Sequence, residues 1–490
     1  MYANADPHLG FAMELVQADV IARLHRLNGE DVFFVTGMDE HGKKIFEAAK
    51  AAGVDTQQFV NEKSQKMQDL LKVLNISNNF FIRTADKENH WPTVEKVWGI
   101  LKENGDIYEK EYEGKYCVGC EAFLLDRELV DGKCPIHLKE LEIIKEKNYF
   151  FKLSKYLSDV KNILEKNEIN IEPANRKLEA LNMIDAGMGD ISISRPASQV
   201  SWGIPVPGDP QVGGQNIYVW FEALLNYLSA VGFAEKDTLR QAQGKFEKYW
   251  PADLHFIGKD ILKFHAIVWP AILLAADIKP PKAIWVHDFI TVDGHKMSKS
   301  LGNVVSPFDI ASKYGGDAFR YFFTVSISEK GFTAAEIDYT EEKFAAKYVA
   351  DLSNGLGNLV SRILNIAKKN QDLLGDVFVE SSEFLTGRRS FSPWEEITTM
   401  NRRIETEKLW ELPKQEDKQD DFKKYITEHI NNLALIAQRI QPWMPETSKK
   451  MFAMIGIKMS DKDRLIWDKQ KIEIGEIKQL FPRVELNKAL

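Results

Sequence analysis

Short apolar strand patterns alternate with longer helical patterns along much of this chain, and the alternation limits the folds it can adopt. The run 32–36 reads as a buried strand between helical patterns over 10–27 and 43–52. Further strand patterns occur at 254–258, before a helix, and at 283–287. Strands that alternate with helices predict an α/β fold with a doubly wound, largely parallel sheet, and ligands at the carboxyl ends of its strands.

Two stretches differ from this pattern and suggest further domains. From Tyr108 to about residue 190, the cysteines and short apolar runs read as an insertion into the sheet domain. From about residue 343, amphipathic helical patterns dominate. We therefore expect four segments: the first half of the sheet domain (1–107), the insertion (108–190), the second half of the sheet domain (191–342) and a helical domain (343–490).

Composition restricts the class of protein. The chain has 490 residues, of which 44% are hydrophobic and 28% charged, as in a globular protein of several domains. It has no long apolar run, and its first residues lack the basic start and apolar core of a signal peptide, so we expect a soluble protein that is not exported and has no membrane partner. The three cysteines, all between Cys117 and Cys134, suit a reducing compartment, so we expect the cytoplasm. The net charge of -8 gives no support for a nucleic-acid partner, which only local motifs can then indicate. The oligomeric state stays open, with a monomer expected.

All three cysteines lie in one part of the expected insertion. Cys117 and Cys120 form one pair, and thirteen residues later Cys134 and His137 form another. Two turns that each offer two ligands have the spacing of a tetrahedral zinc site, and four protein ligands leave no position for a reactive water. The sequence predicts one structural zinc ion, with chance clustering of free thiols as the alternative.

Two motifs far apart in the chain suit phosphate chemistry. His8 and Gly10 stand at the start of the first expected helix, where free backbone N–H groups can hold a phosphate. Lys296-Met-Ser-Lys299-Ser follows a strand and places two ammonium groups on a loop, where they can stabilise charge on leaving pyrophosphate. Taken alone, the first motif favours a structural turn, and a solvated basic loop is the alternative for the second.

Together, in this order and on this architecture, the two motifs resemble the HIGH and KMSKS signatures of class I aminoacyl-tRNA synthetases. Local matches narrow the resemblance to methionyl-tRNA synthetases with one zinc knuckle, over nearly the whole chain. This implies a Rossmann-like, HUP-type catalytic domain with a zinc-binding insertion, followed by an all-α anticodon-binding domain. It also implies a ligase that activates L-methionine with ATP and Mg2+ and transfers it to tRNA(Met), for initiation and elongation of translation.

The resemblance assigns roles to individual residues. His8, Gly10, Lys296 and Lys299 become catalytic, with His8, Gly10 and Lys299 binding ATP, and Arg195 lies near the substrate carboxylate. Asp39, just after the strand 32–36, holds the methionine ammonium. Aromatic residues on two helical faces wrap the methionine thioether. The full set for this pocket is Tyr2, Asp39, Trp220, Ala223, Tyr227, Ile261, Phe264, His265 and Trp269. Without the resemblance, such aromatic stripes read as ordinary core.

The helical domain carries the residues that match the family's readers of the CAU anticodon. Asn358 and Arg362 lie four residues apart on one helical face, and Trp410 ends another helix. The first two offer hydrogen bonds to base edges, and the indole offers a stacking surface for an unstacked base. The family's usual proline before the tryptophan is Leu409 here.

Two departures from the family pattern motivate an alternative. Phe11 replaces the last histidine of HIGH, and Met1 stands at the end of the expected first strand. We expect the open reading frame to extend upstream by an apolar strand of about 5 to 10 residues. The alternative is a catalytically weakened relative that binds tRNA. A synthetase for leucine or isoleucine is disfavoured, since those chains are usually much longer and carry an editing insertion.

Overall fold

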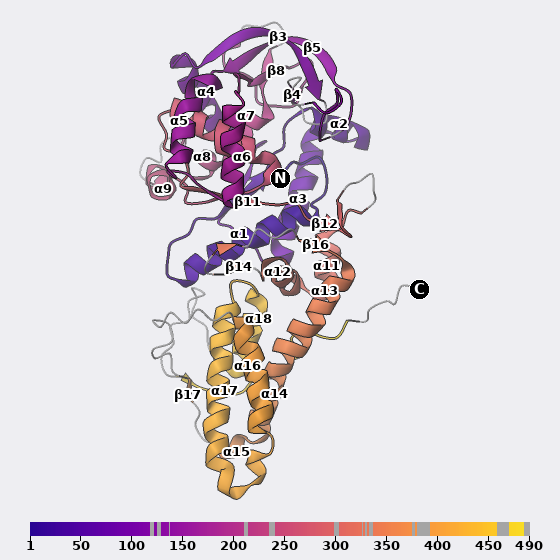
Figure 1. The fold of residues 1–490 in the computed structure, drawn as a ribbon, viewed down its shortest axis with the longest axis vertical. Coiled ribbons are helices and arrows are strands. Elements are labelled where there is room, and N and C mark those ends of the chain that lie inside the picture. Colours follow the sequence, from indigo (N-terminus) through magenta and orange to yellow (C-terminus); the bar gives the residue numbers. More distant parts are fainter. Residues whose placement is uncertain are drawn as a thin grey trace. The chain divides into compact units, whose positions relative to one another are not determined.

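The chain is seen in a computed structural model that describes residues 1–117, 122–124, 129–136, 138–209, 214–234, 241–297, 303–325, 327–328, 331–332, 337–374, 378–379, 393–457 and 470–484 (Figure 1). The chain folds as two units. The first unit contains Met1–Pro7, Phe33–Asp69 and Asn78–Asp288. The second contains His8–Val32, Leu70–Ser77 and Phe289–Leu490, so the chain enters each unit more than once.

The first unit mixes strands and helices. Its strands are β1 (Val35–Met38), β2 (Phe80–Arg83), β3 (Ile107–Cys117), β4 (Ala122–Leu124), β5 (Glu142–Phe151), β6 (Asn170–Glu172), β7 (Ile191–Ser192), β8 (Ser194–Pro196), β9 (Gln215–Ile217), β10 (His255–Gly258) and β11 (Ala283–His287). Its helices are α2 (Lys43–Ala52), α3 (Thr56–Val73, whose last residues belong to the second unit), α4 (Trp91–Glu103), α5 (Leu153–Glu165), α6 (Ala174–Asp185), α7 (Val219–Leu224), α8 (Asn226–Ala230), α9 (Gln241–Tyr249) and α10 (Trp269–Ala275).

Parallel strand pairs confirm the α/β alternation expected from the sequence. β1 pairs with β2, and β11 lies between β10 and β6 in a second parallel sheet. Parallel neighbours need a crossover, which helices supply here. The strand expected at 32–36 begins only at Val35. β6 falls within the range 108–190, so part of the expected insertion contributes a strand to the parallel sheet.

An antiparallel sheet occupies the other part of that range. Its strand order is β4-β3-β5-β7, and β3 and β5 pair continuously from Ile107↔Phe151 to Tyr116↔Glu142. Long antiparallel pairing needs only a local connection, so this ribbon forms from contiguous chain.

Aromatic side chains fill the core of the first unit. Trp98 of α4 is fully buried and meets the rings of Tyr149 and Phe221 edge-on, at centroid distances of 5.6 Å and 5.9 Å. Edge-to-face pairs at these distances add to the stabilisation that comes from burying the rings. The same core, which also includes Phe151 and Trp269, supports α7 and α10, the helices that carry the candidate substrate pocket.

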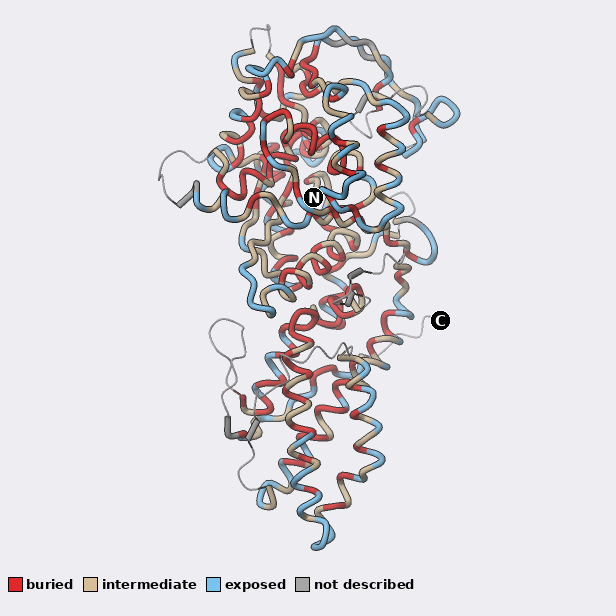
Figure 2. Tube along the Cα trace, turned by 60° about the vertical axis from the view of Figure 1, so that its left-hand side comes forward, coloured by how far each residue is buried: buried red, intermediate tan, exposed pale blue. Residues whose placement is uncertain are grey.

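The second unit is mainly helical. Its helices are α1 (Leu9–Leu27), α11 (Pro307–Tyr314), α12 (Gly316–Thr324), α13 (Glu341–Lys347), the π-helix η5 (Tyr348–Gly357), α14 (Asn358–Lys369), α15 (Gln371–Leu374), α16 (Pro393–Glu407), α17 (Gln419–Ile440) and α18 (Pro445–Ile455). Its short strands are β12 (Thr291–Val292), β13 (His295–Lys296), β14 (Ile327–Ser328), β15 (Gly331–Phe332), β16 (Asp338–Tyr339), β17 (Phe378–Val379) and β18 (Gln470–Lys471). Buried and exposed residues alternate along the helices of the C-terminal part (Figure 2). Within the described residues, none of the helices has the length and apolarity to cross a membrane.

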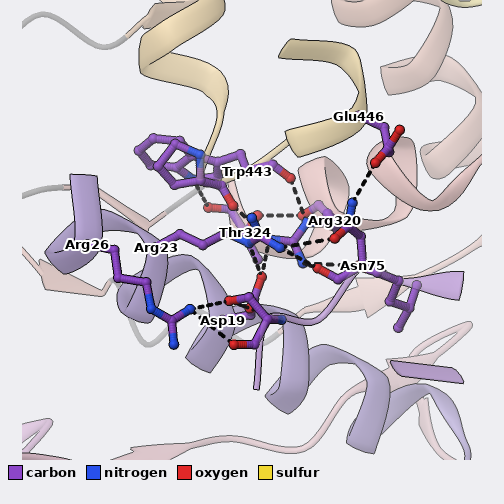
Figure 3. Close-up of polar contacts among 11 residues, drawn as sticks. Asp19, Arg23, Arg26, Asn75, Arg320, Thr324, Trp443 and Glu446 are labelled. Carbon is purple, nitrogen blue, oxygen red and sulfur yellow. Dashed lines mark hydrogen bonds and ion pairs between the residues drawn. The ribbon is translucent and has the colours of Figure 1, made fainter. Parts of the chain in front are cut away.

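A buried ion pair ties separate segments of the second unit together (Figure 3). Arg320 of α12 and Asp19 of α1 are both fully buried, 2.7 Å apart. Arg320 also donates to the carbonyl oxygens of Leu74 (3.0 Å), Pro442 (2.7 Å) and Trp443 (2.9 Å). Because a buried ion pair is tolerated only when its remaining polar atoms are satisfied, these carbonyls are part of what holds α1 against α12 and the α17–α18 junction.

Candidate active site

The start of α1 has the geometry of a capped helix N-terminus. His8 is the N-cap residue, and its Nδ1 accepts a hydrogen bond from the Gly10 N–H at 3.1 Å. In a neutral imidazole the proton then lies on Nε2, as a donor to phosphate requires. A Cβ at Gly10 would lie 3.1 Å from His8 Cε1, so the histidine ring would have to shift by a few tenths of an ångström to admit any other residue. The ring of Phe11 packs on His8 at a centroid distance of 4.4 Å.

The structure brings the expected methionine-pocket residues together within the first unit. Trp220 of α7 stacks on Phe264, with ring centroids 4.8 Å apart and planes 11° from parallel. Tyr2 stacks on Trp220 at 6.4 Å. The neighbouring Ala223 is partly exposed on the same short helix. Three nearly parallel stacked rings and a small residue provide apolar aromatic surface of the kind that suits a thioether.

A second group of pocket residues is joined by hydrogen bonds. The Tyr227 hydroxyl lies 2.8 Å from His265 Nε2, and His265 Nδ1 lies 3.1 Å from the carbonyl oxygen of Ile261. The carbonyl can only accept, so Nδ1 carries the proton and Nε2 accepts from the tyrosine. Phe264 and His265 lie in a π-helical turn, η3 (Phe264–Val268), a geometry often found at functional sites.

His255, at the start of β10, is a pocket neighbour that the sequence analysis missed. Its Nε2 accepts from the Trp269 indole N–H at 3.2 Å, and its ring lies 4.1 Å from that of Tyr227. Burial lowers the pKa of His255 to about 3, and the nearby His265 adds to the effect. The imidazole is therefore neutral at physiological pH. A histidine that opens an apolar strand pattern is the signal that marks it in the sequence.

Asp39 follows β1 and is fixed through its backbone and its side chain. Its N–H donates to the Met1 carbonyl at 2.7 Å, and its carbonyl accepts from Ala3 N–H at 2.9 Å. Asn226 Nδ2 donates to Asp39 Oδ1 at 3.4 Å, a long contact. Burial raises the pKa of the Asp39 carboxyl, and the negative charge of Glu222 adds to the rise. A cationic ligand would offset both effects.

Glu222, also missed by the sequence analysis, lies on α7 with its side chain fully buried. Its Oε1 is 3.1 Å from His41 Nδ1, and its Oε2 is 2.8 Å from His90 Nε2. Burial opposes ionisation, but the two imidazoles outweigh it and lower the pKa of Glu222. Sequence periodicity gave no sign of this cluster, because its members come from three separate elements.

Arg195 of β8 is buried at a small pocket of the first unit. Its Nη1 donates to Ser192 Oγ and to the Ser194 carbonyl, each at 2.7 Å, and its guanidinium lies 4.3 Å from the Tyr218 ring centroid. The pocket is lined by Gly42, Lys43, Tyr116, Arg195, Val200, Ile217, Tyr218 and Val219. An oriented guanidinium beside a pocket suits recognition of a carboxylate.

The expected phosphate-binding loop is described only at its beginning. Lys296 lies in β13, whose backbone pairs with β12 through Thr291↔Lys296. Asp293 and Gly294, with φ of 52° and 73°, form the tight turn between these strands. Lys299 lies outside the described residues.

Two of the four expected zinc ligands are described. Cys117 ends β3 and Cys134 lies at a turn, and both residues are buried. The turn is closed by a hydrogen bond of 2.8 Å from Leu138 N–H to the Cys134 carbonyl. Buried thiols and a tight turn fit a structural zinc site. Cys120 and His137 lie outside the described residues.

The expected anticodon readers Arg362 and Trp410 meet in the second unit. The guanidinium of Arg362 lies 5.5 Å from the Trp410 ring centroid and 2.7 Å from Glu405. Asn358 is exposed at the start of α14. Helix α16 ends at Glu407, so Trp410 lies in the turn beyond it, where Leu409 is fully buried.

Comparisons with known proteins agree with these features. The family model for class I tRNA synthetases (M) matches residues 1–142 and 136–364. A methionine–tRNA ligase of Caldanaerobacter subterraneus is 37% identical over the whole chain and 78% of its own length, and one of Thermotoga maritima is 36% identical over 93% and 74%. The crystal structure of Mycobacterium tuberculosis methionyl-tRNA synthetase bound by methionyl-adenylate matches with a TM-score of 0.86 and 33% identity, over 98% of both chains. The chain therefore belongs to the class I tRNA synthetases, within the family of methionine–tRNA ligases.

Proposed function

We propose that this chain joins L-methionine to tRNA(Met) at the expense of ATP. The observation that carries the proposal is the placement of Asp39 in the same unit as two groups of aromatic residues, around Trp220 and around Tyr227. The acidic group binds the ammonium that every amino acid carries, and the apolar aromatic pocket favours the thioether side chain of methionine.

In the first step the methionine carboxylate attacks the α-phosphorus of ATP. The bond to the bridging oxygen breaks, so methionyl-adenylate forms and pyrophosphate leaves. The nucleophile belongs to the substrate, so the protein mainly positions the reactants and stabilises charge. In the second step a hydroxyl of the terminal tRNA adenosine attacks the activated carbonyl, and AMP leaves.

The proposed catalytic residues have different chemical roles. His8 and Gly10 bind phosphate at the start of α1, and Lys296 and Lys299 stabilise the charge on pyrophosphate. Arg195 binds near the methionine carboxylate. Magnesium accompanies the ATP and shields the charge of its phosphates.

Methionine recognition gains a residue that the sequence did not suggest. Asn226 is buried, its Nδ2 faces Asp39, and its Oδ1 has no hydrogen-bond partner among the described residues. A buried acceptor without a donor is unfavourable, and the methionine ammonium would supply one. Asn226 thus becomes a second acceptor for the ammonium beside Asp39.

Two further sites complete the proposal. Cys117, Cys120, Cys134 and His137 hold one structural zinc in the insertion, supported by the buried thiols of Cys117 and Cys134. Asn358, Arg362 and Trp410 read the anticodon, supported by the contact between the guanidinium and the indole. The four segments expected from the sequence then act as the two halves of the catalytic domain, the zinc insertion and the anticodon-binding domain.

ATP–pyrophosphate exchange across a panel of amino acids tests the proposal. Exchange should depend on methionine and fall when Asp39 is replaced by asparagine, which keeps the shape and removes the charge. The partly exposed Glu179, which pairs with Arg176, offers a matched control as Glu179→Gln. Tight tRNA binding without exchange would instead favour a catalytically weakened relative, the alternative suggested by Phe11 at the position of the last histidine of HIGH.

A further inference from the structure

Glu222 is a buried carboxylate that none of the roles proposed above uses. It lies between two buried imidazoles, those of His41 and His90. An ionised carboxylate removed from water requires compensation by a nearby positive charge or by several hydrogen bonds. The two histidines come from elements far from α7 in the sequence, so the fold assembles this cluster specifically.

The hydrogen bonds around His90 determine where its protons lie. Its Nδ1 is 2.9 Å from Ser229 Oγ, and that hydroxyl donates its single proton to the Leu225 carbonyl at 3.1 Å. Ser229 Oγ therefore accepts from His90 Nδ1, which must carry a proton. The contact of 2.8 Å between His90 Nε2 and Glu222 needs a second proton. His90 and Glu222 together therefore carry one proton more than a neutral imidazole beside an ionised carboxylate would carry. The pair has no net charge.

The short helix α8 links this neutral pair to Asp39, because its Ser229 contacts His90 at 2.9 Å and its Asn226 donates to Asp39 at 3.4 Å. The carboxylate of Glu222 raises the pKa of Asp39 beyond the effect of burial, whereas the amino group of Met1, His90 and His41 lower it. Glu40, the residue that follows Asp39, is itself bound by Arg83 at 2.8 Å. A bare Glu222 would therefore oppose ionisation of Asp39, and a bare imidazolium at His90 would repel an incoming ammonium.

We propose that His90 and Glu222 form a charge-balanced pair that leaves Asp39 as the acidic group available to the methionine ammonium. The inference rests on the proposed function, in which Asp39 binds that ammonium. Both residues act through Asp39 and are therefore positioning residues. Removing the charge of one partner weakens methionine binding, whereas removing both charges together restores it.

The test compares the full-length variants His90→Gln, Glu222→Gln and the double variant. Glutamine removes the charge and keeps the capacity for hydrogen bonds. In ATP–pyrophosphate exchange, the KM for methionine should rise about tenfold or more in each single variant, a change equivalent to one pKa unit. In the double variant it should return to within about threefold of the parent value, because the two effects are coupled. The KM for ATP should stay unchanged in all three.

His25 and Glu30 offer a matched control. They also form a histidine–carboxylate contact, of 2.9 Å, but their side chains are 52% and 57% exposed. The variant His25→Gln with Glu30→Gln should leave the KM for methionine unchanged, since exposed pairs contribute little.

A double variant whose KM for methionine stays more than about threefold above the parent overturns the proposal, because losses of purely structural contacts accumulate. If the single variants do not fold, the double variant decides alone, and its failure to fold also overturns the proposal. Asp39→Asn distinguishes the two levels of the argument. A normal KM for methionine in that variant refutes the ammonium role of Asp39, whereas a defective one with an unrescued double variant refutes only the charge-balanced pair.

Discussion

Replacing Arg320 by methionine should loosen the helices that its guanidinium joins. Methionine has a similar length but offers neither the ion pair with Asp19 nor the hydrogen bonds to the carbonyls of Leu74, Pro442 and Trp443. Breaking a buried ion pair by removing one partner costs about 3 to 5 kcal/mol. Asp19 keeps Arg23 at 2.7 Å and two hydrogen bonds from Ser77, so the lower end of that range applies.

Hydrogen exchange measured by mass spectrometry reports this loss locally, which matters because a chain with two units need not unfold in one step. A loss of about 3 kcal/mol speeds exchange of protected amides about a hundredfold, at a factor of ten per 1.4 kcal/mol. The effect should appear in peptides from α1 and α12, whereas peptides from β10 and β11 of the other unit serve as an internal reference.

The exposed ion pair between Lys313 and Glu341 supplies the control variant, Lys313→Met, which should change exchange by less than about fivefold. If Arg320→Met changes exchange in α1 as little as this control does, the buried network does not stabilise these helices, and the reasoning fails.

Four other outcomes follow. Lys299→Ala should slow ATP–pyrophosphate exchange by about a hundredfold or more with little change in the KM for methionine, and a near-normal rate would remove its phosphate role. Trp410→Ala should lower kcat/KM for tRNA charging by a factor equivalent to about 1 to 3 kcal/mol and leave ATP–pyrophosphate exchange unchanged. Equal losses in both assays would show that Trp410 is a folding residue. Metal analysis should find one zinc per chain, lost in Cys134→Ser, and zinc-free parent protein would contradict the site. Burial raises the pKa of Asp19, but Arg320, Arg23 and the hydrogen bonds from Ser77 outweigh it and hold this pKa below 3.8. The ionised carboxylate therefore stabilises the fold above about pH 4, and this contribution is lost as the pH falls through the lowered pKa. Denaturation midpoints should fall between pH 6 and pH 3, and unchanged midpoints would contradict the reasoning.

The elements with strong apolar patterns were predictable from the sequence. β11 lies where the run 283–287 indicates a strand, and α2 spans 43–52 as expected, because local sequence and tertiary burial favour the same structure there. β6 was not predicted, since a strand of three residues with one buried side chain carries almost no periodic signal. Its pairing with β11 depends on contacts more than a hundred residues apart in the sequence.

The residues of the candidate site likewise include some that were predictable from the sequence and some that were not. Asp39 and the rings around Trp220 and Tyr227 were predictable because a resemblance linked them, and the structure then brings them together. Glu222 and His90 were not, because a charged residue in an apolar segment reveals its partner only when the fold is known. The π-helical turn at Phe264 was likewise hidden, since an inserted residue in a helix leaves the apolar pattern almost unchanged.

If these side chains form the methionine pocket proposed above, the hydrogen bonds among them also determine which amino acids that pocket rejects. Tyr227 donates to His265, His265 donates to a backbone carbonyl, and the Trp269 indole donates to His255. These donors are already engaged with neighbours. A glutamine side chain, similar in length to methionine, would have to bury its amide oxygen without help from them, at about 1 to 3 kcal/mol. Such a pocket rejects amino acids with polar side chains because its own donors are already hydrogen-bonded, and it needs neither a steric clash nor a charge to do so. A substitution that frees one of these donors should therefore increase the attachment of wrong amino acids to tRNA.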